Sequence, residues 1–143
     1  SSCRVRNGDV VAPFGGLIRD VALVDSPYHE GQNLRITLLV CVTGGYYLRS
    51  PVEGVATEVR GMHRKSAALL TDKGELVVMK VKSGTLLGAP LLRVPFGTRI
   101  GLARTCGSRV GMLHLELYLP AKARAEVKIG QRVKIGCSVL AKM

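Results

Sequence analysis

The sequence predicts an all-β fold with at most one short helix. Its apolar runs are short and end at turn-forming residues, and its 17 Gly and 6 Pro are spread along the chain. Leucines alternate with other side chains across residues 113–119, which is the period of two of a β-strand. No segment of ordinary helix length keeps a helical period. We therefore expect many short strands joined by turns.

The individual strands follow from these runs in chain order. The expected strand-bearing segments are residues 9–24, 33–42, 50–59, 66–81, 98–105, 112–120 and 125–143. Residues 71–74, Thr-Asp-Lys-Gly, predict the turn of a hairpin within residues 66–81. The one segment in which a short helix is expected is residues 64–70.

Two segments carry glycines with a mechanical role. Pro51 and Gly54 predict a strand that enters, bends and continues, and Gly130 and Gly136 predict tight turns. Together the segments resemble the two halves of a barrel-sandwich hybrid, as in biotinyl and lipoyl domains. Those domains carry a modified Lys at a hairpin tip. The Met79-Lys80 pair lies inside an apolar strand, so a carrier function is not expected.

Length and composition bound the class of protein. A chain of 143 residues that is 47% hydrophobic predicts one folded domain over residues 1–143 and excludes a disordered chain. No apolar run has the length that a membrane span requires. The four cysteines, at positions 3, 41, 106 and 137, show neither CxxC spacing nor a Cys/His cluster. We expect a reducing compartment, no disulfide, no metal site and a buried free thiol at Cys41.

Charge is distributed unevenly along the chain. The net charge is +11, and residues 60–143 carry sixteen basic and four acidic side chains. This favours a polyanionic partner, namely RNA, an anionic membrane surface or an acidic protein, although a solvated basic face is the plain alternative. The chain begins Ser1-Ser2-Cys3-Arg4, and this acid-poor start is compatible with the end of an organellar transit peptide. A mitochondrial location is expected.

The basic residues of the second part fall in turn-rich segments. The expected polyanion-binding residues are Arg60, Arg64, Lys65, Lys122, Arg124, Lys128, Arg132 and Lys134. Between residues 126 and 136, Val and Ile alternate with the charged residues, so the charges are expected to project away from the core. Such a face suits rRNA phosphates or an anionic phospholipid such as cardiolipin. Stacking aromatics are scarce, which disfavours base-specific recognition.

Four motifs in order carry a family resemblance. They are VVAPFGG at residues 10–16, LRITLLVCVTGGYYLRSPVEGVATEV at 34–59, RIGLARTCGSRV at 99–110, and YLPAKARAEVKIGQRVKIGCSVLAKM at 118–143. By these motifs the chain resembles the C-terminal catalytic core of phosphatidylserine decarboxylases. The resemblance implies a barrel-sandwich-hybrid-like β-sandwich. It also implies self-cleavage between Gly107 and Ser108, which converts Ser108 into a pyruvoyl group that serves as the electron sink for decarboxylation.

Three departures from the family pattern affect this chemistry. The resemblance places a proton-accepting Asp where Gly15 stands, and glycine cannot accept a proton. It places His where Tyr46 and Arg49 stand, and several more residues than usual follow the Gly-Ser pair. We therefore expect Ser108 and Gly107 to be relics and the chain to be an inactive, unprocessed relative without a cofactor.

Three functions remain open on the sequence alone. The first is a structural or binding subunit of a large mitochondrial assembly, with the ribosome among the candidates, that uses the basic face. The second is an active pyruvoyl-dependent decarboxylase, in which an acid outside the motif, such as Asp25, replaces the missing base. The third is a lipid-binding pseudoenzyme whose old substrate pocket holds a phospholipid.

Overall fold

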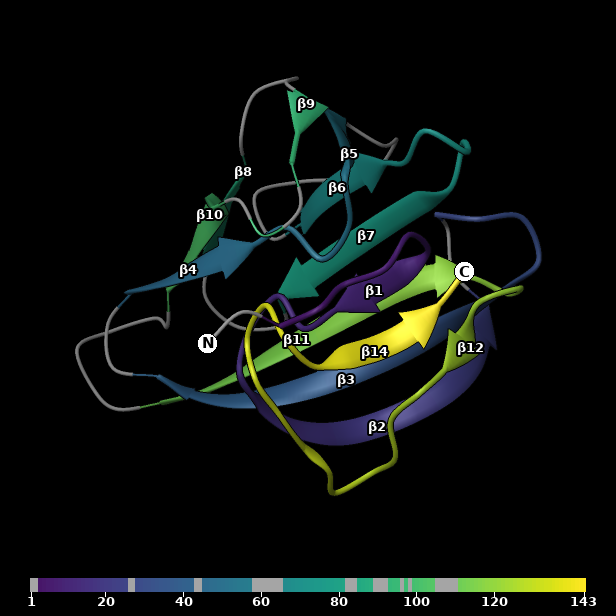
Figure 1. Ribbon diagram of the computed structural model, residues 1–143. Helices are drawn as coiled ribbons and strands as arrows, with labels where there is room; N and C mark the ends of the chain where they lie inside the picture. The colour runs from purple at the N-terminus through teal and green to yellow at the C-terminus, as the bar shows by residue number, and fades with distance from the viewer. Residues whose placement is uncertain are drawn as a thin grey trace.

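The computed structural model describes residues 3–25, 28–42, 45–57, 66–81, 85–88, 93–95, 97, 99–104 and 111–143. These residues form fourteen strands in three antiparallel sheets and contain no helix (Figure 1). The predicted all-β fold is confirmed. Within the described ranges, no helix is long and apolar enough to cross a membrane.

The largest sheet contains eight of these strands and supplies most of the core. Their order is β13 (Arg132–Val133), β2 (Gly16–Asp25), β3 (Gln32–Val42), β11 (Gly111–Pro120), β7 (Leu76–Val81), β6 (Ser66–Leu70), β5 (Gly54–Thr57) and β9 (Arg93–Val94). Leu38 of β3 lies in register between Ile18 of β2 and Leu115 of β11. All three side chains are fully buried, so the register sets one apolar face of the sheet against the core.

Two smaller sheets complete the fold. One has the order β1 (Asp9–Val11), β14 (Val139–Lys142), β12 (Arg124–Ala125), and the other β4 (Gly45–Arg49), β10 (Arg99–Arg104), β8 (Thr85–Gly88). In Figure 1, β1 and β14 lie in front of β11 and β3. Val10 of β1 and Leu140 of β14 belong to the same buried cluster as Leu38. The core is thus the interior of a β-sandwich.

The alternation predicted for residues 113–119 is confirmed for Leu115, Leu117 and Leu119, which are fully buried in the main core. The opposite face of β11 is also covered, because Glu116 is 3% and Tyr118 is 9% exposed. Tyr118 joins a second apolar cluster, and its ring meets that of Tyr28 edge-on at 5.3 Å. The alternation in the sequence therefore distinguishes two buried faces of β11, one in the main core and one in the second apolar cluster, and not a buried face from an exposed one.

The predicted helix over residues 64–70 is wrong for residues 66–70, which form strand β6; Arg64 and Lys65 lie outside the described residues. Pairing with β7 explains the difference, since Ala67 and Leu69 face the main core in register with β7. This tertiary pairing overrides the helix preference of alanine and leucine. The predicted hairpin is confirmed, and Thr71 and Gly74 close its turn by a backbone hydrogen bond of 2.9 Å.

Two of the glycine predictions can be checked directly. Gly130 and Gly136 have φ angles of 90° and 69°, which favour glycine at both turns. Gly54 serves a different purpose, because a Cβ there would lie 2.3 Å from the Leu70 carbonyl oxygen. Only glycine lets β5 approach the end of β6 this closely.

The expectation of no disulfide is wrong. Cys3 and Cys137 are disulfide-bonded, with their Cα atoms 5.2 Å apart and 134 positions between them in sequence. The pairing of β1 with β14 brings the two ends of the described chain together, which Cys spacing alone could not reveal. Such a bond stabilises a fold by about 2–5 kcal/mol. It also removes the argument for a reducing compartment, because disulfides persist mainly in oxidising ones. The side chain of Cys41 is outside the described residues.

Candidate functional site

The connections that carry the family-like motifs lie near one another. Strand β10 pairs with β4 so that Arg104 is opposite Gly45, and β11 pairs with β3 so that Gly111 is opposite Val42. The described residues that flank positions 105–110 are therefore paired with the described residues that flank positions 43 and 44. Gly107 and Ser108 themselves lie outside the described residues.

The segment from Pro13 to Gly16 lies close to the same strands. A Cβ on Gly16 would lie 2.5 Å from the Leu39 carbonyl oxygen, so a glycine is required there. A Cβ on Gly15 would lie 3.5 Å from the Val133 carbonyl oxygen, which is an ordinary contact. Steric crowding at the Cβ position therefore does not account for glycine at position 15, and this position cannot supply the proton acceptor that Ser108 would need.

Arg49 stands where the family-like pattern has a histidine. Its side chain donates a hydrogen bond to a backbone carbonyl. Its Nη1 donates to the Gly97 carbonyl at 3.0 Å, and its backbone N–H donates to the Pro13 carbonyl at 3.2 Å. Gly97 in turn donates to the Ser50 carbonyl at 3.2 Å. Arg49 thus fixes the approach to β10. For Tyr46 only the backbone, in β4, is described.

The described acids near these segments have other partners. Asp20 accepts a hydrogen bond of 2.8 Å from Arg35, and Asp9 accepts one of 2.9 Å from the Arg6 backbone N–H. Asp25, the suggested substitute base, is exposed at the end of β2 opposite Gln32. Among the described residues, no three His, Cys, Asp or Glu side chains are grouped so that they could hold a metal ion.

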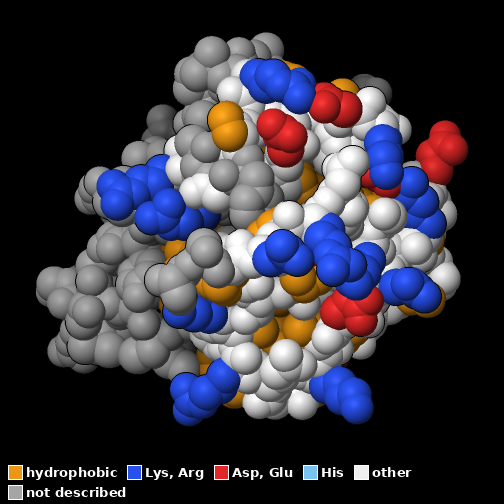
Figure 2. All heavy atoms as spheres, in the orientation of Figure 1, with side chains coloured by type: hydrophobic (Ala, Val, Ile, Leu, Met, Phe, Trp, Pro, Cys, Tyr) orange, Lys and Arg blue, Asp and Glu red, His pale blue; other side chains and the backbone are white. Residues whose placement is uncertain are grey.

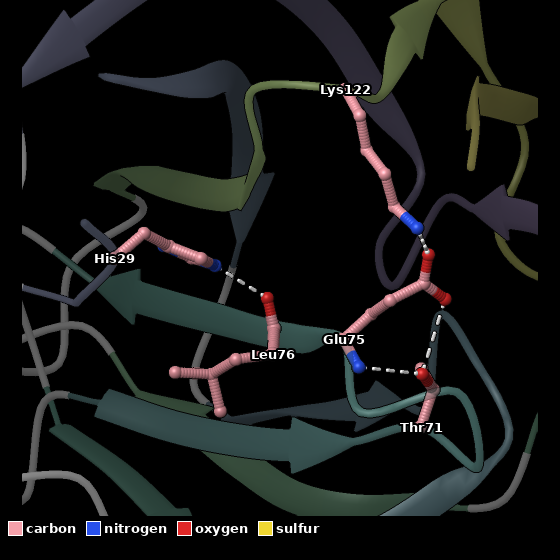
Figure 3. Close-up of polar contacts among 5 residues, drawn as sticks. All are labelled: His29, Thr71, Glu75, Leu76 and Lys122. Atoms are coloured by element: carbon pink, nitrogen blue, oxygen red, sulfur yellow. Dashed lines mark hydrogen bonds and ion pairs between the residues drawn. The ribbon is translucent and has the colours of Figure 1, made fainter. Parts of the chain in front are cut away.

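His29 has a structural role (Figure 3). Its Nε2 lies 2.6 Å from the Leu76 carbonyl, and its Nδ1 lies 3.1 Å from the side-chain oxygen of Asn33. Asn33 is fully buried, and its amide nitrogen has no partner within the described part of the chain. Exchanging the amide oxygen and nitrogen lets Asn33 donate to Nδ1 while a neutral His29 donates to Leu76. His29 therefore ties the β2–β3 connection to β7.

The predicted polyanion-binding residues are in three different situations. Arg60, Arg64 and Lys65 lie outside the described residues. Lys122 reaches from the β11–β12 turn to the buried carboxylate of Glu75, which also meets Thr71 (Figure 3). Arg124, Lys128, Arg132 and Lys134 are exposed, and in the described ranges their charged groups make no ion pair. The predicted outward projection is confirmed for Lys128, Arg132 and Lys134. Ile129, which was expected to face inward, is instead 65% exposed.

The fold adds cations that sequence reasoning missed. The arm (residues 3–8), the sheet β1-β14-β12 and residues 126–138 form what we call the basic layer. Its exposed cations are Arg4, Arg6, Arg124, Lys128, Arg132, Lys134 and Lys142, and its acids are Asp9 and Glu126, a net of +5. None of the seven is ion-paired to a described residue. In Figure 2, Lys and Arg side chains gather over β14, β12 and the loop below them.

The comparisons with known proteins point to one family. No model of a known protein family matches the chain. The phosphatidylserine decarboxylase proenzyme of Ralstonia pickettii (strain 12J) is 28% identical over 150 residues, covering 94% of this chain and 70% of that protein. The corresponding proenzymes of Paraburkholderia phymatum and Burkholderia multivorans are 27% and 28% identical, with the same 94% of this chain covered. The chain is related to the phosphatidylserine decarboxylases.

This relationship accounts for the order of the four motifs. Because 94% of the chain is covered, one family-like unit includes both the basic layer and the strands around residues 105–110. The phosphatidylserine decarboxylase relationship does not explain the glycine at position 15 or the unpaired cations.

Proposed function

We propose that this phosphatidylserine decarboxylase relative is a non-catalytic subunit of a larger mitochondrial assembly, and that it binds the phosphate backbone of RNA, rRNA included, through its basic layer. The observation that carries the proposal is the group of seven exposed cations without ion-pair partners among the described residues. Unpaired surface cations that neutralise phosphates release counterions from RNA, which is the main source of affinity in such complexes.

The missing proton acceptor supports the non-catalytic part of the proposal. A serine hydroxyl is a weak nucleophile without an adjacent base. Gly15 supplies none, Arg49 is occupied with the Gly97 carbonyl, and Asp20 is held by Arg35. The residues present thus do not fit formation of a pyruvoyl group, and we derive no catalytic step through one.

The side chains of the basic layer favour a nucleic-acid backbone over a bilayer. Four of its seven cations are arginines, which suit bidentate contact with phosphate. Ile129 is its one strongly exposed large apolar side chain within the described residues. A membrane-binding surface needs a more extensive apolar face, usually with Trp, Phe or Leu.

A salt titration of RNA binding tests the proposal. The probe is a single-stranded RNA of about 20 nucleotides without secondary structure, which offers more phosphates than one basic layer covers. If about four phosphates are neutralised, the logarithm of the binding constant should fall with the logarithm of salt concentration with a slope of about −3. A chain that fails to bind this RNA at about 50 mM salt would overturn the proposal.

Matched variants assign the binding to the basic layer. The double variant R132Q/K134Q should reduce the magnitude of the slope by about 1.4, the value for two phosphates. The control K73Q/R93Q removes two exposed cations from the β6–β7 turn and β9 and should leave the slope unchanged. Equal effects of the two double variants would contradict binding through the basic layer.

Vesicles provide the competing outcome. Binding to vesicles rich in anionic lipid, but not to RNA, would replace the RNA proposal with a membrane-surface one. I129S then distinguishes the two, because an apolar side chain that enters a bilayer contributes to vesicle binding and not to phosphate contact.

An active decarboxylase is the second candidate. It is favoured by one observation, which is that the connection containing Gly107 and Ser108 begins and ends beside β4 and β3, where the resemblance places the reactive site. Intact-mass measurement decides between the two. Two fragments divided before Ser108, the second carrying a pyruvoyl group, would establish the enzyme, and one uncut chain would eliminate it.

A further inference from the structure

The disulfide connects two basic segments that are remote in sequence. Cys3 is directly followed by Arg4 in the arm, and Cys137 lies in a turn that begins at Lys134. That turn is closed by hydrogen bonds from the Cys137 and Ser138 N–H groups to the Lys134 carbonyl, at 3.2 and 3.0 Å. The bond therefore places arm cations on the same layer as the cations of residues 126–138.

The two ends of the arm are held differently. Near β1, the Arg6 N–H donates to the Asp9 carboxylate at 2.9 Å, and the Met143 N–H donates to the Gly8 carbonyl at 2.9 Å. At the other end, the disulfide at Cys3 is the link that the structure records. Between these anchors, Arg4 has no recorded hydrogen bond or ion pair within the described residues. Its position thus depends on the disulfide.

The arm also forms one side of a cleft. A cavity of about 350 Å³ is lined by Arg4, Arg6, Asp9, Glu126, Val139 and Lys142. Lys142 is in register with Arg124 of β12 on one side and with Asp9 of β1 on the other. One oxygen of Asp9 already accepts the Arg6 N–H. The cleft therefore offers three cationic groups, opposed by the two carboxylates of Asp9 and Glu126.

We infer that the Cys3–Cys137 disulfide controls this cleft, and that the cleft binds one RNA phosphate only while the bond holds Arg4 beside Arg6 and Lys142. The inference rests on the proposed RNA binding and adds a site and a regulation to it. A dithiol reductant is the second reactant. It transfers two electrons and two protons to the protein disulfide, giving two cysteine thiols and the oxidised cyclic disulfide of the reductant. Cys3 is exposed, so a reductant can reach it.

Comparison of the oxidised and reduced chain tests the inference. Reduction should weaken binding of the same single-stranded RNA about three- to ten-fold at about 100 mM salt and reduce the magnitude of the salt slope by about 0.7, the value for one phosphate. Circular dichroism at the assay temperature checks that the reduced chain is folded. An unchanged slope in a folded, reduced chain would overturn the inference.

Variants separate the arm cations from the bond itself. C3S should bind as the reduced chain does and should not respond to dithiol, whereas C41S/C106S should respond like the unaltered chain. R4Q/R6Q in the oxidised state should reproduce the weaker binding without any reduction, so this variant tests the cleft even if reduction unfolds the protein. E126Q should strengthen binding, because it removes one of the two acids of the cleft.

The outcomes distinguish this inference from the proposal on which it rests. Absence of RNA binding by the oxidised chain overturns the proposed function. Strong binding that is lost in R132Q/K134Q but unaffected by reduction and by R4Q/R6Q leaves the proposed function in place and overturns the control by the disulfide. Weakening by both reduction and R4Q/R6Q, with C41S/C106S still responsive, supports both.

Discussion

The outer face of the eight-stranded sheet and the basic layer differ in whether their charged side chains are ion-paired. On the sheet, Arg35 donates to Asp20 at 2.8 Å and lies 3.8 Å from Glu116, which is almost fully buried. In the basic layer, Arg124 and Lys142 sit side by side in register and neither has an acid partner within the described residues. The two surfaces belong to one chain, so the difference comes from the placement of the charged residues rather than from the overall composition.

The difference separates charges needed for folding from charges available for binding. A buried carboxylate requires a partner because removing it from water is costly. Exposed cations without partners contribute little to the fold and repel one another weakly. Substitutions on the sheet should therefore affect stability, whereas substitutions in the basic layer should affect binding. Four experiments can break or sharpen this distinction.

The largest expected effect comes from a backbone contact of the large sheet. A Cβ at Gly54 would lie 2.3 Å from the Leu70 carbonyl, so G54A should lower the free energy of unfolding by about 3 kcal/mol. The matched change in the basic layer is G130A, where φ is 90° and no atom lies within 4 Å. It should cost only about 1–2 kcal/mol, from backbone strain. Urea unfolding of both variants gives the comparison, and equal losses would break it.

The second experiment removes one arginine from each surface. R35M leaves Glu116 buried beside an apolar side chain and should lower the free energy of unfolding by about 2 kcal/mol, a value reduced because Arg35 is partly exposed. R124M should change it by less than about 0.5 kcal/mol. Thermal unfolding at one salt concentration measures both. A loss for R124M as large as that for R35M would contradict the assignment of Arg124 to binding.

Sequence patterns predicted the strands better than they predicted which strands pair and which side chains are buried. The alternation in β11 and the hairpin of β6 and β7 are local, so they could be predicted. The helix expected over residues 64–70 failed because alanine and leucine preferences are weak beside the pairing of Ser66–Leu70 with β7. The burial of Glu116 could not be predicted, since it depends on Arg35, 81 positions away in sequence.

Only the C-terminal cations of the basic layer could be predicted, because the arm joins them through a pairing of strands that are remote in sequence. Arg124, Lys128, Arg132 and Lys134 are close in sequence and could be grouped by eye. The arm does not stand out in the sequence, because residues 1–59 carry six acidic and five basic side chains and are not basic overall. Antiparallel pairing of β1 with β14 then places the arm beside the C-terminal cations. The Cys3–Cys137 disulfide joins the two segments, but the spacing of the four cysteines does not reveal which of them pair.

The third experiment tests the enclosed face of β11 by pH. Burial, with help from the nearby Glu116 charge, raises the pKa of Tyr118 to about 12. In the unfolded chain the phenol ionises near about 10, so the folded state holds the proton more tightly between these values. The free energy of unfolding should therefore fall by about 1–2 kcal/mol more in the unaltered chain than in Y118F as pH rises from 10 to 12. Parallel curves for the two proteins would show that the phenol is not enclosed.

The smallest effect concerns an ion pair that is both exposed and well aligned. Arg93 donates to both oxygens of Asp72, at 2.8 and 2.7 Å, and this contact lowers the pKa of the Asp72 carboxyl. The depressed pKa adds stability above the ordinary carboxyl range that is lost as pH falls through the folded value. Carboxyl NMR should find the Asp72 pKa below its usual range, returning toward it in R93Q and at about 1 M salt. If salt leaves this pKa low, solvent does not screen the pair, and the outer surface around β9 should be grouped with the enclosed face of the sheet rather than with the basic layer.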